Sequence, residues 1–278
     1  MESSTDPTPI RKDPIFPEGN IQKDDKETLQ APNGIEFLFD GPSLEAGIKP
    51  LFLYFALSKE ASLKEPPFNR PITTLKENYK TVRLASVSLP FHNPKYPIED
   101  AMSSWSQAFK DDPDFLNHFI ENLKEAVLFL IAKGIVSKER LGFGGLSRGG
   151  YIAGRLASLI KAKALLVYAP LTELTFLSEL KEIQNKTHLK NYSKDLGEIE
   201  VRAYIGNRDQ RVGTRNCFDW IESIVEEQYK DSIRSPKVEL ILSPSIGHKG
   251  HGTPPFVFDA GAHWMGMILT ETGSSLLS

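Results

Sequence analysis

The chain has a single cysteine, Cys217, among 278 residues, so it cannot form an intrachain disulfide. It also has no apolar stretch long enough to span a bilayer, and its first residues are polar, with no apolar segment following a basic one. These absences predict a cytoplasmic protein without a signal peptide, in a reducing compartment. Cys217 lies in an apolar helical pattern, which favours a core position over a reactive thiol.

Neither sign of charge dominates, since the formal net charge is −3 and 25% of the residues are charged. No strongly basic run points to a nucleic-acid or membrane-surface partner. The sequence also lacks His, Cys, Asp and Glu at metal-ligand spacing, a P-loop, and a complete dinucleotide-binding fingerprint. We therefore expect no metal and no cofactor.

What the chain does contain is a regular alternation of two hydrophobic patterns. Residues 1–30 are rich in Ser, Pro, Asp and Lys and predict a flexible leader, whereas residues 31–278 predict a single domain. Nearly continuous apolar runs predict strands at Ile35–Phe39, Leu51–Ala56, Val82–Leu89, Arg140–Gly144, Ala164–Ala169, Val201–Ile205 and Val238–Leu242. Amphipathic patterns predict helices at Pro71–Tyr79, Asp112–Gly134 (with Asp112 as N-cap), Gly149–Lys161, Thr214–Lys230 and Asp259–Leu269.

This alternation predicts the α/β class, with an open, mostly parallel, twisted sheet flanked by helices. Ligands of such sheets bind beyond the carboxyl ends of the strands. Loops that follow strands are therefore the places to look for chemistry.

One such loop contains a serine between two glycines. The segment Gly145-Leu146-Ser147-Arg148-Gly149 has the G-x-S-x-G pattern, with a strand-like run before it and a helix-like run after it. This context predicts a sharp, strained turn that projects the Ser147 hydroxyl above the sheet, and the glycines avoid collisions with neighbouring backbone. A plain turn serine is the alternative.

A serine nucleophile needs a base and an acid, and later strand ends offer both. Asp209 follows the Val201–Ile205 strand, although it could instead form a surface ion pair with Arg208 or Arg211. His248 follows the last strand and is the predicted base, with His251 as its competitor in the same glycine-rich loop.

From Gly34 to Leu269 the chain resembles the α/β-hydrolase superfamily. The Ser147 elbow, the Gly206–Val212 stretch with its G-x-x-D-x-x-V pattern and the Gly247-His248 pair are similar to dienelactone-hydrolase-like and acetyl-esterase-like enzymes, and to prolyl-oligopeptidase-clan peptidases. The resemblance implies Ser147 as nucleophile, His248 as general base and Asp209 as the residue that orients the imidazole.

The resemblance also implies an oxyanion hole formed by two backbone N–H groups. The first belongs to Arg148, and the second to Ala56 or Leu57, where many relatives have a His-Gly pair that this chain lacks. The Arg148 side chain either contacts an acidic group on a substrate or lies exposed at the start of its helix.

Residues 170–200 form an insertion that predicts a short lid. We expect Leu174, Phe176 and Leu177 to line an acyl pocket, and His92 either to line the pocket or to be a structural loop histidine. A lid this small favours small or medium substrates.

The sequence thus predicts a serine hydrolase that cleaves small or medium carboxylic esters through an acyl-enzyme. A peptidase or amidase of the prolyl-oligopeptidase clan is the second hypothesis, ranked lower because residues 1–30 cannot form the β-propeller usual in such peptidases. A non-catalytic binding protein with this fold is the third. The partner expected is a small-molecule ester, and the oligomeric state is left open.

Overall fold

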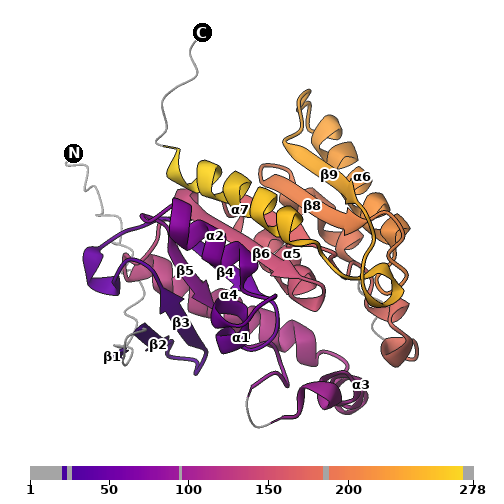
Figure 1. Ribbon diagram of the computed structural model, residues 1–278, viewed down its shortest axis with the longest axis horizontal. Coiled ribbons are helices and arrows are strands. Elements are labelled where there is room, and N and C mark those ends of the chain that lie inside the picture. Colours follow the sequence, from indigo (N-terminus) through magenta and orange to yellow (C-terminus); the bar gives the residue numbers. More distant parts are fainter. Residues whose placement is uncertain (1–20, 24–26, 94–95, 184–187, 272–278) are drawn as a thin grey trace, which may run out of the picture.

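The continuous apolar runs of the sequence form the parallel part of a nine-stranded sheet in the computed structural model (Figure 1). The structure describes residues 21–23, 27–93, 96–183 and 188–271. The strands are β1 (Ile21–Lys23), β2 (Glu27–Gln30), β3 (Glu36–Asp40), β4 (Leu51–Phe55), β5 (Arg83–Ser86), β6 (Leu141–Leu146), β7 (Ala164–Tyr168), β8 (Glu200–Gly206) and β9 (Val238–Ser243). The α-helices are α1 (Lys59–Lys64), α2 (Arg70–Asn78), α3 (Ala101–Asp111), α4 (Phe115–Ala132), α5 (Arg148–Ile160), α6 (Thr214–Lys230) and α7 (Pro255–Thr270). The 3-10 segments are η1 (Leu44–Ala46), η2 (Ile98–Asp100), η3 (Lys138–Arg140), η4 (Leu174–Phe176), η5 (Ser178–Leu180), η6 (Leu189–Leu196) and η7 (His248–Gly250).

The strand order across the sheet is β1-β2-β3-β5-β4-β6-β7-β8-β9. From β5 to β9 every neighbouring pair is parallel, whereas β1, β2 and β3 are joined to the sheet by antiparallel pairing. The predicted α/β architecture with a mostly parallel sheet is therefore confirmed. Parallel pairing places the carboxyl ends of β4, β6, β8 and β9 along one edge of the sheet.

Helices cover both faces of this sheet, as the apolar strands require. Side chains of α3, α4, α5 and α6 form one core with alternate residues of the strands. Side chains of α2 and α7 form a second core on the opposite face, and α7 lies beside α2 in front of the strands (Figure 1). Every residue of β4 and β7 is buried, and each large apolar side chain so buried contributes about 1.5–3 kcal/mol.

The middle of the sheet is unusually poor in side chains because β6 reads Leu-Gly-Phe-Gly-Gly-Leu. A Cβ atom on Gly142 would lie 2.6 Å from the Met265 sulfur of α7, and one on Gly144 would lie 2.5 Å from the Phe52 ring. Both distances are far shorter than normal contacts. The glycines therefore let the Phe52 ring and α7 pack directly against the central strand.

Some element boundaries differ from the sequence predictions. The leader was predicted to extend to residue 30, but Glu27–Gln30 form β2, which pairs with β3 and buries Leu29. Residues 1–20 of the predicted leader lie outside the described residues. The short polar segment Glu-Thr-Leu-Gln carries little hydrophobic signal, so only its pairing partner reveals it as a strand.

Two helix starts were also misplaced. Helix α4 begins at Phe115, because the Asp112 carboxylate accepts a hydrogen bond from the Asp114 amide (2.9 Å) in the turn before the helix. Helix α7 begins at Pro255, four residues before the prediction, because a proline is well suited to the first helical position. Cys217 is buried in the core as predicted, and burial raises the pKa of its thiol.

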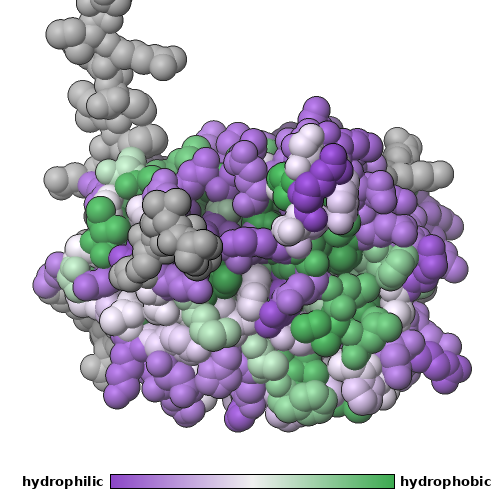
Figure 2. Space-filling model, turned by 90° about the horizontal axis from the view of Figure 1, so that it is seen from above, coloured by the Kyte–Doolittle hydropathy of each residue, from purple (hydrophilic) through white to green (hydrophobic). Residues whose placement is uncertain are grey.

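Seen from above, the surface is mostly hydrophilic, and hydrophobic residues gather to the right of the centre (Figure 2). Within the described ranges, every helix is too short or too polar to cross a membrane.

Arg83 connects two loops, β3–β4 and α4–β6, at the amino-terminal end of the sheet. Its side chain is fully buried, and burial lowers the pKa of its guanidinium. The guanidinium donates hydrogen bonds to the carbonyl oxygens of Pro42 (3.0 Å), Ile135 (2.6 Å), Gly47 (3.2 Å) and Ser43. These bonds give every arm of the buried guanidinium a backbone acceptor, so its charge is not left without hydrogen bonds.

We expect Arg83→Met to lower the free energy of unfolding by about 3 kcal/mol or more, because it removes four hydrogen bonds that a buried, charged side chain donates to two loops. Arg215→Met is the control, since it removes an exposed arginine of a surface ion pair and should cost less than about 1 kcal/mol. Urea unfolding of both variants tests the prediction, and equal losses would contradict it.

Candidate active site

Ser147 occupies the turn between β6 and α5, as the sequence predicts. Its backbone has φ 55° and ψ −115°, which is rare for a residue with a side chain and costs on the order of 1–3 kcal/mol. A Cβ on Gly145 would lie 2.2 Å from the Gly149 carbonyl carbon, and one on Gly149 would lie 2.0 Å from the Phe55 oxygen. Only glycine fits at these two positions, so the predicted reason for the G-x-S-x-G pattern is confirmed.

Asp209 lies in the loop that follows β8, and its side chain is buried. One carboxylate oxygen, Oδ1, accepts hydrogen bonds from the backbone amides of Arg211 (2.8 Å) and Val212 (3.0 Å). The Arg211 side chain pairs with Glu179 instead, so the alternative of an Asp209–Arg211 surface ion pair is wrong. The other oxygen, Oδ2, is left to contact a histidine.

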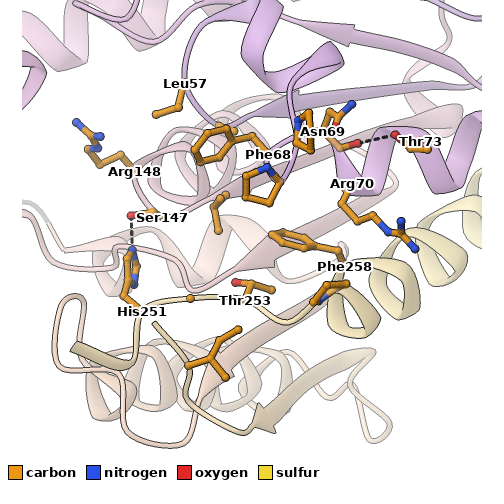
Figure 3. Close-up of a pocket in the computed structure, with 17 residues that line it drawn as sticks. Leu57, Phe68, Asn69, Arg70, Thr73, Ser147, Arg148, His251, Thr253 and Phe258 are labelled. Carbon is orange, nitrogen blue, oxygen red and sulfur yellow. Dashed lines mark hydrogen bonds between the residues drawn. The ribbon is translucent and has the colours of Figure 1, made fainter. Parts of the chain in front are cut away.

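That histidine is His251. Its Nδ1 lies 2.7 Å from Asp209 Oδ2, and its Nε2 lies 3.0 Å from Ser147 Oγ (Figure 3). Because an ionised carboxylate can only accept a hydrogen bond, Nδ1 carries the proton and Nε2 is free to accept one from the serine hydroxyl. The structure therefore brings serine, histidine and aspartate into one hydrogen-bonded chain.

His248, the predicted base, does not take part in this hydrogen-bonded chain. His248 is exposed in η7, whereas the chain turns back through the Ile246–Gly252 bridge and places His251 at the sheet edge. The turn depends on Gly250, which has φ 73° and whose Cβ would lie 2.4 Å from the Arg208 carbonyl oxygen. The glycines on both sides of His251 are the feature of the sequence that could have pointed to it, because glycines allow that segment to pack closely against neighbouring backbone.

The candidate oxyanion donors have different surroundings. Among the described residues nothing accepts a hydrogen bond from the Arg148 amide, which lies at the amino-terminal end of α5, where the helix dipole favours negative charge. Ala56 and Leu57 line the cavity, but the backbone amides of both donate to the buried Ser62 hydroxyl, at 3.1 and 3.3 Å. A second donor from this loop would have to share its hydrogen with Ser62.

A cavity of about 860 Å³ opens beside Ser147 and His251. Its walls come from the segment between α1 and α2, the histidine loop and the start of α7, and they include the rings of Phe68 and Phe258 (Figure 3). Most of the lining is apolar, and the side chain of Arg70 lies at the end remote from Ser147.

The residues predicted to line an acyl pocket do not line this cavity. Leu174 and Leu177 are buried in the core, and Phe176 packs near Gly213. The described part of the predicted lid, 170–183 and 188–200, contributes none of the cavity wall. Its leucines pack into the hydrophobic core instead. An apolar residue that packs in a core gives the same sequence pattern as one that lines a pocket, so the sequence could not distinguish the two.

His92 is also absent from the cavity wall, and it is a buried loop histidine. Its Nδ1 donates to the Pro90 carbonyl oxygen (2.8 Å), and its Nε2 has no hydrogen-bond partner among the described residues. Burial and then the nearby Arg148 charge lower the pKa of His92 to about 4. The imidazole is therefore neutral near pH 7.

Because the folded protein holds the pKa of His92 below the usual 6.5, the unfolded chain binds the extra proton more readily between about pH 6.5 and 4. Stability is therefore lost as the pH falls through this window, by up to about 3 kcal/mol from this group. We expect His92→Gln to reduce the loss in the free energy of unfolding between about pH 7 and about pH 4.5, as measured by urea unfolding at both pH values. His118→Gln, at an exposed position, should leave this loss unchanged. Equal losses in the wild type and in His92→Gln would refute the lowered pKa of His92.

Within the described ranges, no group of three or more His, Cys, Asp or Glu side chains is arranged to hold a metal ion. The chain's sequence matches no known protein family and no curated protein.

Solved structures are nevertheless similar to it. Acetyl xylan esterase 1 from Thermoanaerobacterium sp. is 15% identical with a TM-score of 0.60, over 92% of this chain and 89% of the esterase. TT1662 from Thermus thermophilus is 14% identical with a TM-score of 0.60, over 92% of this chain and 100% of TT1662. Porphyromonas gingivalis dipeptidyl peptidase 4 is 12% identical with a TM-score of 0.54, and the match covers 90% of this chain but only 35% of the peptidase. The sheet, its flanking helices and these similarities show that the chain has the α/β-hydrolase fold.

Proposed function

We propose that the protein is a serine hydrolase that cleaves small or medium carboxylic esters through an acyl-enzyme. The observation that carries the proposal is the hydrogen-bonded chain from Ser147 Oγ through His251 to Asp209. A serine hydroxyl is a weak nucleophile by itself, and this arrangement is the established way to activate it.

In the first step, His251 Nε2 takes the proton of Ser147 as the serine oxygen attacks the ester carbonyl carbon. The imidazolium that forms is stabilised by Asp209, whose carboxylate stays ionised and keeps the ring oriented. The negative charge that develops on the carbonyl oxygen is stabilised by the Arg148 amide and the amino-terminal end of α5.

The tetrahedral intermediate then collapses. His251 donates its Nε2 proton to the alcohol oxygen, the carbon–oxygen bond breaks, and the acyl group remains on Ser147. In the second step His251 takes a proton from water, which attacks the acyl carbon and releases the acid and the free serine.

The cavity supports an ester of modest size. A volume of about 860 Å³ lies within the range of small-molecule sites, and its apolar walls suit an alkyl or aryl group. One of the similar structures is an esterase by name. The similarity to a dipeptidyl peptidase favours a peptidase or amidase as the second candidate, because the same three residue types can cleave an amide.

The first test is covalent labelling. We expect a fluorophosphonate to add one equivalent to the wild-type protein and none to Ser147→Ala, as measured by intact mass. The same pair is then assayed with p-nitrophenyl esters of increasing acyl length and with aminoacyl p-nitroanilides, and Ser147→Ala should lose at least about 10⁴-fold in kcat/KM.

Each outcome decides between the candidates. Ester turnover well above anilide turnover supports the esterase, and the reverse supports the peptidase. An unlabelled wild-type protein that is folded by circular dichroism would overturn the proposal and favour a non-catalytic binding protein.

The two histidines give a matched pair of variants. We expect His251→Ala to reduce kcat by about 10⁴-fold or more, because the proton acceptor is removed. His248→Ala should retain activity within about threefold, since His248 is exposed and contacts neither Ser147 nor Asp209. Ester kinetics on both proteins check this, and loss of activity in His248→Ala alone would reassign the base.

A further inference from the structure

The side chain of Arg148 lies beside the nucleophile without a carboxylate partner. It is half-buried, donates to the Met102 sulfur (2.8 Å) and lies 5.8 Å from the centroid of the Trp105 ring. No Asp or Glu oxygen among the described residues comes within 4.0 Å of it. Four other arginines of the described chain pair with an acid: Arg70 with Asp259, Arg202 with Glu239, Arg211 with Glu179 and Arg215 with Asp219.

Glu179, an acid whose charge acts on Arg148, is already paired with another arginine. Glu179 accepts two hydrogen bonds from Arg211, at 2.9 and 2.6 Å, and these bonds lower the pKa of Glu179 to about 2. The Arg211–Glu179 pair is therefore neutral as a unit at physiological pH, and so is His92. Arg148 is therefore left without a hydrogen-bonded acid of its own among the described residues.

Burial makes this charge costly. It lowers the pKa of Arg148 to about 10, and the neighbouring Arg211 charge acts in the same direction. The guanidinium remains protonated near pH 7. A partly desolvated cation of this kind gains most from a ligand that supplies an opposite charge and accepts its hydrogen bonds.

The position of Arg148 gives that charge access to a substrate. Arg148 directly follows Ser147 and lines the cavity. Its side chain extends from the nucleophile away from Phe68 and Phe258, so the apolar part of the cavity and the guanidinium lie on different sides of Ser147 (Figure 3). A substrate held at Ser147 can therefore present an apolar group to one side and a polar group to the other.

We propose that the Arg148 guanidinium binds a carboxylate on the substrate, so that the preferred esters are monoesters of short dicarboxylic acids. This inference rests on the proposed function and names its substrate class. A single carboxylate matches the one positive charge of the guanidinium, whereas a phosphate dianion would exceed it. The planar guanidinium also fits a carboxylate through two parallel hydrogen bonds.

The test compares two esters that differ only in this charge, ethyl hydrogen glutarate and its terminal carboxamide analogue. The quantity measured is the ratio of their kcat/KM values, acid over amide, at neutral pH and low salt. Any effect of a substitution on the Arg148 backbone amide alters both substrates alike and cancels in the ratio. Arg148→Met removes the charge, and Arg148→Lys keeps it without the planar donors.

A ratio of about ten or more is expected for the wild type, and Arg148→Met should lower it by roughly ten- to a hundredfold. Arg148→Lys should retain an intermediate ratio. Arg215→Met is the matched control, because it changes the net charge equally at an exposed site outside the cavity, and it should leave the ratio unchanged. A wild-type ratio near one, or equal losses in Arg148→Met and Arg215→Met, would overturn the inference.

A binding measurement separates this inference from the proposed function. Ethyl hydrogen glutarate is titrated calorimetrically into Ser147→Ala and into the double variant Ser147→Ala/Arg148→Met, and about tenfold weaker binding to the double variant is expected. Weaker binding without turnover or fluorophosphonate labelling in the wild type would support the carboxylate site and refute the hydrolase. Labelling and turnover of the wild type together with equal binding to both variants would support the hydrolase and refute the carboxylate site.

Discussion

The close approach of the β6–α5 turn to the end of β4 is the contact on which the rest of the site depends. Gly149 lies so near the Phe55 carbonyl that no side chain fits between them, and Gly145 is packed equally tightly against Gly149. This contact holds Ser147 in a backbone conformation that it would otherwise leave. It also aims the amino-terminal end of α5 at the space above the serine, where the oxyanion would form.

Much of the fold could be predicted because its signals are local. The strands β4 to β9 are short apolar runs, and the elbow around Ser147 is recognisable from its glycines and its flanking patterns. Asp209 could be placed because it follows a strand and parallel strands end together. The β2 strand gave no comparable signal, since its stability comes from pairing with β3.

The rest of the site depends on contacts between distant segments, which a single sequence does not display. His248 and His251 are three residues apart, and only the bridge between Ile246 and Gly252 determines which one returns to the sheet. The cavity wall comes from the segment before α2 and from the start of α7, while the leucines of the predicted lid complete the core. Whether an apolar side chain covers a core or lines a cavity is decided by tertiary packing.

The way Asp209 is held has a consequence for how this site tolerates sequence change. Its carboxylate is fixed by the main-chain amides of Arg211 and Val212, not by their side chains. For this purpose either position accepts any amino acid except proline, which has no amide hydrogen. The position of the carboxylate is thus determined by the backbone conformation of this loop. Two proteins can therefore hold such an aspartate in the same way while having few identical residues around it.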